Sequence, residues 1–93
     1  MAQLPFAIDV YAARISQATE LTTRAGLDAI IVGPGPDLDY LIGFKGDTFE
    51  RLTALVIPAM GEPTLVVPRM ELPLLRETAV TALGIKVAGW NDG

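Results

Sequence analysis

The segment Gly33-Pro-Gly-Pro36 is the first place where chemistry could be expected, because it follows an apolar run and precedes a short helical pattern. A glycine-rich turn before a helix can bind phosphate through backbone N–H groups. Two prolines remove two of those donors, and no Lys-Ser/Thr pair or Gly-x-Gly-x-x-Gly pattern follows. A structural turn is therefore favoured over a mononucleotide site, and a partner-facing loop is a further interpretation.

Four carboxylates follow this turn without forming a metal-binding pattern. Asp37 and Asp39 are two residues apart, so they point to different sides of a helix, and Asp37 is interpreted as a helix cap. Asp47 and Glu50 lie in a polar segment that is interpreted as solvated. The sequence contains no His and no Cys, which removes the commonest general base and metal ligand as well as the thiolate nucleophile. We expect no catalytic residue, metal or other cofactor in this chain.

Arg51 permits two interpretations. An arginine near the aromatic residues Phe44 and Phe49 can hold a carboxylate through its planar guanidinium group. An arginine at the start of a strand is more often solvated. Residue types alone leave both possibilities open.

The elements that must position these residues begin with a long helix. Apolar residues at helical spacing predict a helix over residues 10–25, with Asp9 as its N-cap and Gly26 directly after its end. Arg14 is expected on the solvent side of this helix. Residues 29–32 are short, continuous and largely β-branched, which is typical of a strand buried on both faces, as in a parallel sheet.

Further along, the sequence predicts a short helix that stops at Gly43, two strands of an antiparallel hairpin, a second long helix and a fourth short strand. Their expected bounds are residues 37–42, 51–57, 64–67, 70–83 and 85–88. The resulting order, α-β-α-β-β-α-β, predicts an α/β fold with a mixed β-sheet and helices flanking it on both faces.

Composition limits the functional classes. The chain has 93 residues, enough for one domain, and 51% of them are hydrophobic, so either the core is generous or part of the apolar surface faces a partner. The net charge of −4 argues against nucleic acid. No apolar run approaches the roughly 20 residues of a membrane span, and no signal-peptide pattern is present. We expect a cytoplasmic protein that binds neither nucleic acid nor membranes.

Several motifs, in order, resemble the amino-terminal domain of the creatinase/prolidase/aminopeptidase P family. They are Gly-Leu-Asp-Ala with the apolar strand that follows it (residues 26–32), and Tyr-Leu-Ile-Gly-Phe, in which a short helix ends (residues 40–44). A second apolar strand (residues 53–57), a turn containing Gly61 and the segment Leu-Val-Val-Pro (residues 65–68) follow. The resemblance extends over about residues 11–90. Residues 49–56 are most similar to bacterial Xaa-Pro dipeptidases. The resemblance implies the ribonuclease H-like fold of that amino-terminal domain.

The resemblance also implies that catalysis belongs elsewhere in the parent protein. Enzymes of this family hold two divalent metals, Mn, Co or Zn, on Asp, Asp, His, Glu and Glu in a carboxy-terminal "pita-bread" domain. Hydroxide bridging the metals attacks the peptide bond before proline. Residues 1–93 are therefore interpreted as a non-catalytic accessory domain, cut from a longer Xaa-Pro dipeptidase-type metallopeptidase.

In this family the amino-terminal domain mediates dimer or tetramer contacts, and its short helix and the following loop cover the cleft of the partner subunit. The expected partners are the chain's own C-terminal catalytic domain and a second subunit, with peptide substrate only in the parent. Ile42 stands where the family motif usually has Thr. By position, the candidates for the cleft wall are Asp39, Tyr40, Gly43, Phe44 and Arg51.

One alternative stays open, a free-standing, non-enzymatic binding or oligomerisation module of the same fold. It predicts a stop codon directly after Gly93. The accessory-domain hypothesis predicts a reading frame that continues for a few hundred residues.

Overall fold

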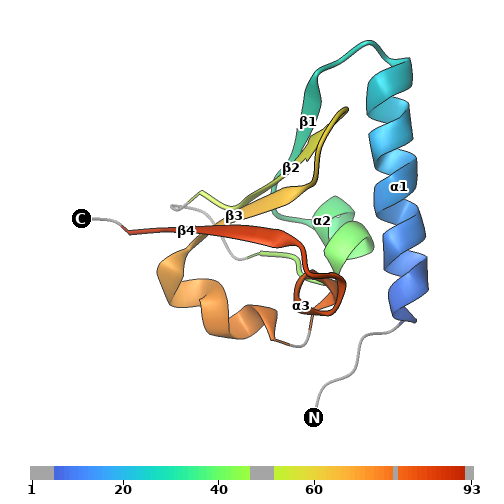
Figure 1. Cartoon of the computed structure of the whole chain (residues 1–93). Coiled ribbons are helices and arrows are strands. Elements are labelled where there is room, and N and C mark those ends of the chain that lie inside the picture. Colours follow the sequence, from blue (N-terminus) through green and yellow to red (C-terminus); the bar gives the residue numbers. More distant parts are fainter. Residues whose placement is uncertain (1–5, 47–51, 77, 92–93) are drawn as a thin grey trace.

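A computed structural model of the chain describes residues 6–46, 52–76 and 78–91, and the fold is drawn in Figure 1. Helices alternate with strands, apart from one hairpin near the middle of the chain and one pair of successive short helices after it, which confirms the predicted α/β class. The elements are α1 (Ile8–Arg24), β1 (Ala29–Val32), α2 (Pro36–Ile42), β2 (Ala54–Pro58), β3 (Thr64–Pro68), the 3-10 helix η1 (Arg69–Leu75), α3 (Ala79–Leu83) and β4 (Lys86–Trp90).

The four strands form one mixed sheet in the order β1-β2-β3-β4. The first three strands are antiparallel, which confirms the predicted hairpin of β2 and β3, and β4 is parallel to β3. The expectation that residues 29–32 are buried on both faces of a parallel sheet is wrong. Strand β1 is an antiparallel edge strand, and Ile31 is 71% exposed. A short apolar run does not reveal whether both of its faces are covered.

The hydrophobic core lies on one face of the sheet. Every described helix contributes to it, together with alternate residues of β2 and β3. The core residues are Ile15, Leu38, Leu41, Ile42, Leu55, Ile57, Leu65, Val67, Leu75 and Val80. Figure 1 shows α1 and α2 beside β1 and β2, and α3 below β4. The expectation of helices on both faces is therefore wrong for the described residues, whose helices all cover the same face.

The predicted second long helix, over residues 70–83, is also wrong. Pro73 lacks the backbone N–H group that an α-helix needs at that position, and the segment around it forms η1 instead. Thr78 then starts the separate helix α3, because its Oγ1 accepts a hydrogen bond from the Val80 N–H at 3.2 Å. The same hydroxyl donates to the Leu75 carbonyl at 2.8 Å. The chain therefore turns between two short helices.

The helix starts differ from the predicted caps. Helix α1 has Ala7 as its N-cap, so Asp9 lies in the first turn, and α2 has Gly35 as its N-cap, so Asp37 lies inside the helix. Both carboxylates still lie where the helix dipole favours negative charge. The predicted position of Gly26 directly after the α1 C-cap is confirmed. No helix in the described part of the chain is long and apolar enough to cross a membrane.

Candidate functional site

The α2 segment, residues 33–46, leaves the sheet after β1 and returns toward β2. Its two ends, residues 34–35 and 45–46, lie against each other and are called the neck here. The Gly35 N–H donates a hydrogen bond to the Lys45 carbonyl at 2.9 Å, which joins the two sides of the neck. Gly46 has φ +77°, and a Cβ at this residue would lie 3.1 Å from the Pro34 Cβ. The glycine therefore permits a close approach of the two sides, and the hydrogen bond joins them where α2 leaves the sheet.

The inner side of the α2 segment is anchored in the core. Leu38 and Ile42 have no exposed surface, and Phe44 is partly buried against the same core cluster. Gly43 ends the helix in the left-handed conformation, with φ 71°, and its N–H donates to the Asp39 carbonyl at 2.9 Å. The candidates Gly43 and Phe44 therefore join the end of α2 to the core.

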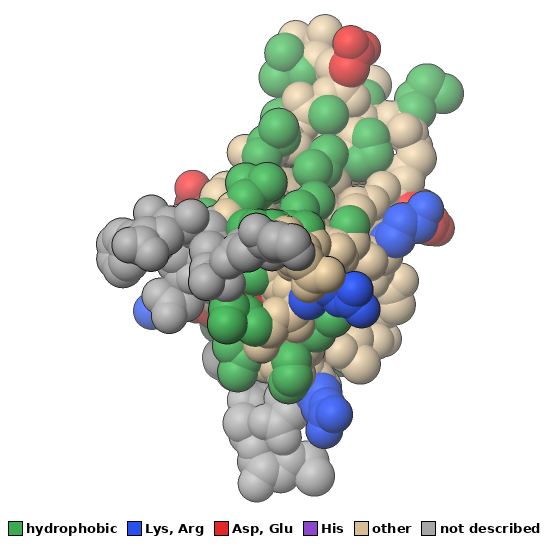
Figure 2. Space-filling model, turned by 90° about the vertical axis from the view of Figure 1, so that its left-hand side faces the viewer, with side chains coloured by type: hydrophobic (Ala, Val, Ile, Leu, Met, Phe, Trp, Pro, Cys, Tyr) green, Lys and Arg blue, Asp and Glu red, His purple; other side chains and the backbone are tan. Residues whose placement is uncertain are grey.

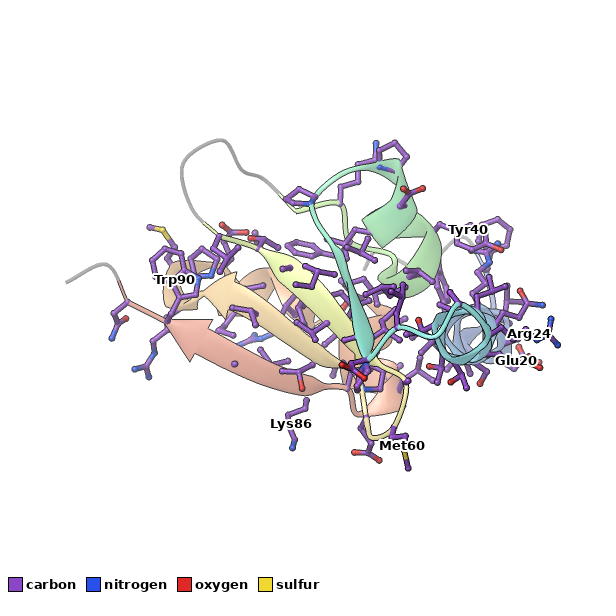
Figure 3. The ribbon with its side chains drawn as sticks, turned by 90° about the horizontal axis from the view of Figure 1, so that it is seen from above. Glu20, Arg24, Tyr40, Met60, Lys86 and Trp90 are labelled. Carbon is purple, nitrogen blue, oxygen red and sulfur yellow. The ribbon has the colours of Figure 1, made fainter. Side chains whose placement is uncertain are left out.

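The outer side of the segment presents Tyr40, a residue that is 51% exposed. Arg14 of α1 reaches it from 26 residues away: Nη1 donates to the Tyr40 carbonyl oxygen at 2.8 Å, and Cζ lies 4.0 Å from the centre of the Tyr40 ring. The same Cζ lies 4.5 Å from the ring centre of Phe6 and 5.5 Å from that of Tyr11. These four residues are called the Arg14 cluster below, and Tyr40 lies on the side where α2 meets α1 (Figure 3).

The Arg14 cluster is a tertiary feature that residue-by-residue reasoning missed. Arg14 was expected to be a solvent-side residue of its helix. Stacking of a guanidinium on aromatic rings, combined with a hydrogen bond to the backbone, fixes both the cation and the exposed ring. Tyr11, three residues before Arg14, is the local signal that an aromatic partner was available, but nothing local indicates Tyr40.

Four of the five predicted wall residues lie together in the α2 segment. Asp39 is partly exposed in the helix, Tyr40 projects outward, and Gly43 and Phe44 follow at the helix end. The fifth, Arg51, lies outside the described residues. The structure therefore places a short helix on the core, with one exposed aromatic residue, Tyr40, that contacts Arg14.

The described residues do not fit the pair of divalent metals that the family resemblance implies for the parent. Among residues 6–46, 52–76 and 78–91, no group of three or more His, Cys, Asp or Glu side chains could hold a metal ion. We therefore derive no chemical step through a metal for this chain.

Comparisons with a family model and with a curated protein indicate the same group of proteins. Residues 14–92 match the family model of the creatinase/prolidase N-terminal domain. The chain is 50% identical over 88 residues to the probable dipeptidase PepE of Mycobacterium tuberculosis, a match that covers 95% of this chain and 24% of that protein. The chain thus spans about a quarter of the length of this curated relative.

Solved structures show the same similarity in three dimensions. The dipeptidase PepE from Mycobacterium ulcerans superposes with a TM-score of 0.90 at 53% identity, over 95% of this chain and 24% of that chain. The creatinase/prolidase N-terminal domain of an X-Pro dipeptidase from Streptococcus pyogenes superposes with a TM-score of 0.74 at 27% identity. That match covers 87% of this chain and 63% of that domain structure.

Proposed function

The chain belongs to the creatinase/prolidase N-terminal domain family, and on that premise we propose that it is the non-catalytic accessory domain of an Xaa-Pro dipeptidase-type metallopeptidase. The observation that carries the proposal is the match of residues 14–92 to this domain, together with the 50% identity to a probable dipeptidase about four times as long. In this proposal the parent hydrolyses peptide bonds before proline in the cytoplasm. Its two divalent metals are bound outside this chain.

The proposed role of the domain is oligomerisation, with the α2 segment forming part of the wall of a partner subunit's cleft. A wall must present an ordered surface, because each side chain that is ordered only on binding costs conformational entropy. The Arg14 cluster and the anchored neck supply that order before any partner is present. Tyr40, exposed but fixed by Arg14, is the central residue of this proposal, beside Asp39, Gly43, Phe44 and Arg51.

The first experiment is to sequence the source gene beyond the codon for Gly93. A reading frame that continues for a few hundred residues, with spaced Asp, Asp, His, Glu and Glu ligands, is the expected result. A stop codon at that point would refute the accessory-domain proposal and favour the free-standing module.

The second experiment tests the cleft wall in the full-length enzyme. Tyr40→Ala should lower kcat/KM for an Xaa-Pro dipeptide by roughly tenfold, the equivalent of about 1.4 kcal/mol of transition-state stabilisation. Arg14→Gln, which frees the ring without removing it, should have a smaller effect. Leu21→Ala is the control, because Leu21 is also exposed but lies on α1 outside the Arg14 cluster.

The wall role is rejected if Tyr40→Ala leaves kcat/KM unchanged while the variant remains folded and oligomeric. Gel filtration and far-UV circular dichroism supply those two checks. An equal loss of activity in the Leu21→Ala enzyme would point to general destabilisation.

A further inference from the structure

Strand β1 has a neighbouring strand on one side only. The sheet order places β1 at one end and β4 at the other. Figure 1 shows β1 uppermost in the sheet, and Figure 3, seen from above, looks onto its free edge, with no described helix or strand drawn in front of it. A free edge exposes unpaired backbone N–H and C=O groups, which can pair with a strand of another chain.

The register shows which backbone groups of β1 point outward. In an antiparallel pair, residues alternate between hydrogen-bonded and non-hydrogen-bonded positions. The Ala59 N–H donates to the Asp28 carbonyl at 2.8 Å, so the bonded positions fall on the even-numbered residues of β1, and Ala29 and Ile31 occupy non-bonded positions. Pro58, the partner of Ala29, has no N–H group and fits a non-bonded position. The N–H and C=O groups of Ala29 and Ile31 therefore point away from β2, toward the free edge.

The β1 edge lacks the features that keep edge strands from pairing. Charged side chains, prolines and bulges protect such edges, but β1 contains only Ala, Ile and Val. Ile31 is 71% exposed. Figure 2 shows hydrophobic side chains over the upper and central parts of the side turned to the viewer, the height at which Figure 1 places β1. The opposite edge strand, β4, carries Lys86 and Gly89, so β1 is the edge that another strand fits better.

A second copy of the chain is complementary to this edge. Antiparallel pairing about a two-fold axis at Ile30 sets Ala29 of one copy opposite Ile31 of the other, so each outward N–H faces an outward C=O. The same arrangement brings the start of one β1 beside the end of the other. Asp28 is exposed at the start, and Lys45 is exposed in the neck that follows the end. Opposite charges therefore lie near each other at both ends of the pair, which favours this arrangement.

We propose that two copies of the chain pair through their β1 strands, so that their sheets join into one continuous sheet. The inference rests on the oligomerisation that the proposed function includes, and it names a surface that a second copy uses. A strand of 4 residues is too short to bury the roughly 1,000 Å² of a stable interface. Pairing of two isolated chains is therefore weak, with a dissociation constant of about 0.1–1 mM. It becomes complete where other contacts of the parent hold two subunits together.

Proline substitution in β1 tests whether the pairing uses the backbone. Ile31→Pro removes an N–H group that makes no bond to β2, and proline is tolerated at edge positions whose N–H faces solvent. Ile31→Thr is the matched control, because it also removes apolar surface but keeps the N–H group and a β-branched side chain that suits a strand. Sedimentation equilibrium of the 93-residue chain, at concentrations up to about 1 mM, measures the dissociation constant. Ala29→Pro, whose N–H also points outward, replaces Ile31→Pro if circular dichroism shows that Ile31→Pro does not fold.

The expected result is that the unsubstituted chain changes from monomer toward dimer over this range. Ile31→Pro should raise the dissociation constant by roughly tenfold or more, because one hydrogen bond is lost on each side of the two-fold axis. Ile31→Thr should raise it by less than about threefold. Amide hydrogen exchange supplies a second readout. The Ile31 N–H should exchange about twofold more slowly when half of the chains are paired, since only unpaired chains exchange, whereas exchange of the Ile30 N–H, which is bonded to β2, should not depend on concentration.

Two outcomes overturn the inference. A chain that stays monomeric at about 1 mM, with an Ile31 N–H that exchanges at the same rate at every concentration, does not pair through β1. Equal weakening by Ile31→Pro and Ile31→Thr would assign the association to side chains instead of the strand edge. Neither outcome affects the reading frame beyond Gly93 or the hydrolysis of Xaa-Pro dipeptides by the full-length enzyme. Those two measurements test the proposed peptidase assignment separately.

Discussion

Replacing Arg14 with Gln tests whether the Arg14 cluster fixes α2 against α1. The substitution removes the guanidinium that lies 4.0, 4.5 and 5.5 Å from the ring centres of Tyr40, Phe6 and Tyr11. It also removes the 2.8 Å hydrogen bond from Nη1 to the Tyr40 carbonyl. Glutamine is a good helix former, so α1 itself should be little affected.

The expected loss follows from these contacts. A cation over an aromatic ring at an exposed site contributes about 0.5–1 kcal/mol, and a hydrogen bond adds about 1 kcal/mol net. The three rings share one cation, so their contributions are not additive. We expect the free energy of unfolding to fall by about 1–2 kcal/mol, and the Tm of a domain this small to fall by about 4–8 °C per kcal/mol.

Arg24→Gln is the matched control on the same helix, with the same change of charge. Arg24 pairs with Glu20 at 3.1 Å, but the two side chains are 71% and 61% exposed. Such an exposed i,i+4 pair contributes only about 0.3–0.5 kcal/mol. Arg14→Lys keeps the charge but loses the planar fork, so its loss should lie between those of the two glutamine variants.

The assay is urea unfolding followed by far-UV circular dichroism, repeated at low and high salt. The stabilisation by Arg24 should decrease as salt screens its ion pair, whereas most of that by Arg14 should persist. Equal losses for Arg14→Gln and Arg24→Gln would refute the reasoning, because the cluster would then contribute no more than a solvated ion pair.

Two further substitutions test the neck and the start of α3. Gly46→Ala should cost about 2–3 kcal/mol, because the positive φ strains any other residue and the new Cβ meets Pro34 at 3.1 Å. Gly26→Ala is the control, because Gly26 has a similar φ of +73° but nothing lies within 4 Å of the new Cβ, and it should cost only about 1 kcal/mol. Equal losses of unfolding free energy in the two variants, measured by chemical denaturation, would show that the contact with Pro34 is unimportant. Thr78→Ala should lower the free energy of unfolding by about 1–2 kcal/mol, because it removes a helix cap and leaves the Val80 N–H and the Leu75 carbonyl each without this partner. Thr78→Ser keeps the hydroxyl, so it should recover most of that loss in thermal unfolding.

Much of the fold could be predicted because its signals are local. Glycines mark the ends of α1, α2 and α3, and the left-handed conformations of Gly26, Gly43 and Gly84 agree with this. The hairpin of β2 and β3 follows from two apolar runs around a turn of proline and glycine. The prediction of a long second helix over residues 70–83 was wrong, because the apolar spacing was given more weight than Pro73, which breaks α-helical hydrogen bonding.

The candidate site could be predicted only as a segment. The motif at residues 40–44 indicated where a wall could lie, and four of its five proposed members occur in the α2 segment. The role of each in a cleft stays a prediction. The order of residues does not show that the Tyr40 ring points outward and that Phe44 packs inward. Tyr40 is contacted by Arg14 of α1, and Phe44 packs against the core cluster, so both orientations depend on residues far away in the chain.

The sequence by itself determined most element types, the glycines at which α1, α2 and α3 stop and the apolar character of each strand, because backbone preferences and turn chemistry act between neighbours. Only the tertiary structure decided that β1 is an edge strand, that all described helices cover one face, and that Arg14 stacks on Tyr40. Strand order and the pairing of surfaces depend on contacts between residues far apart in the chain. The same apolar strand can bury the side chains of its inner face in several arrangements, and the packing of the whole domain selects one of them.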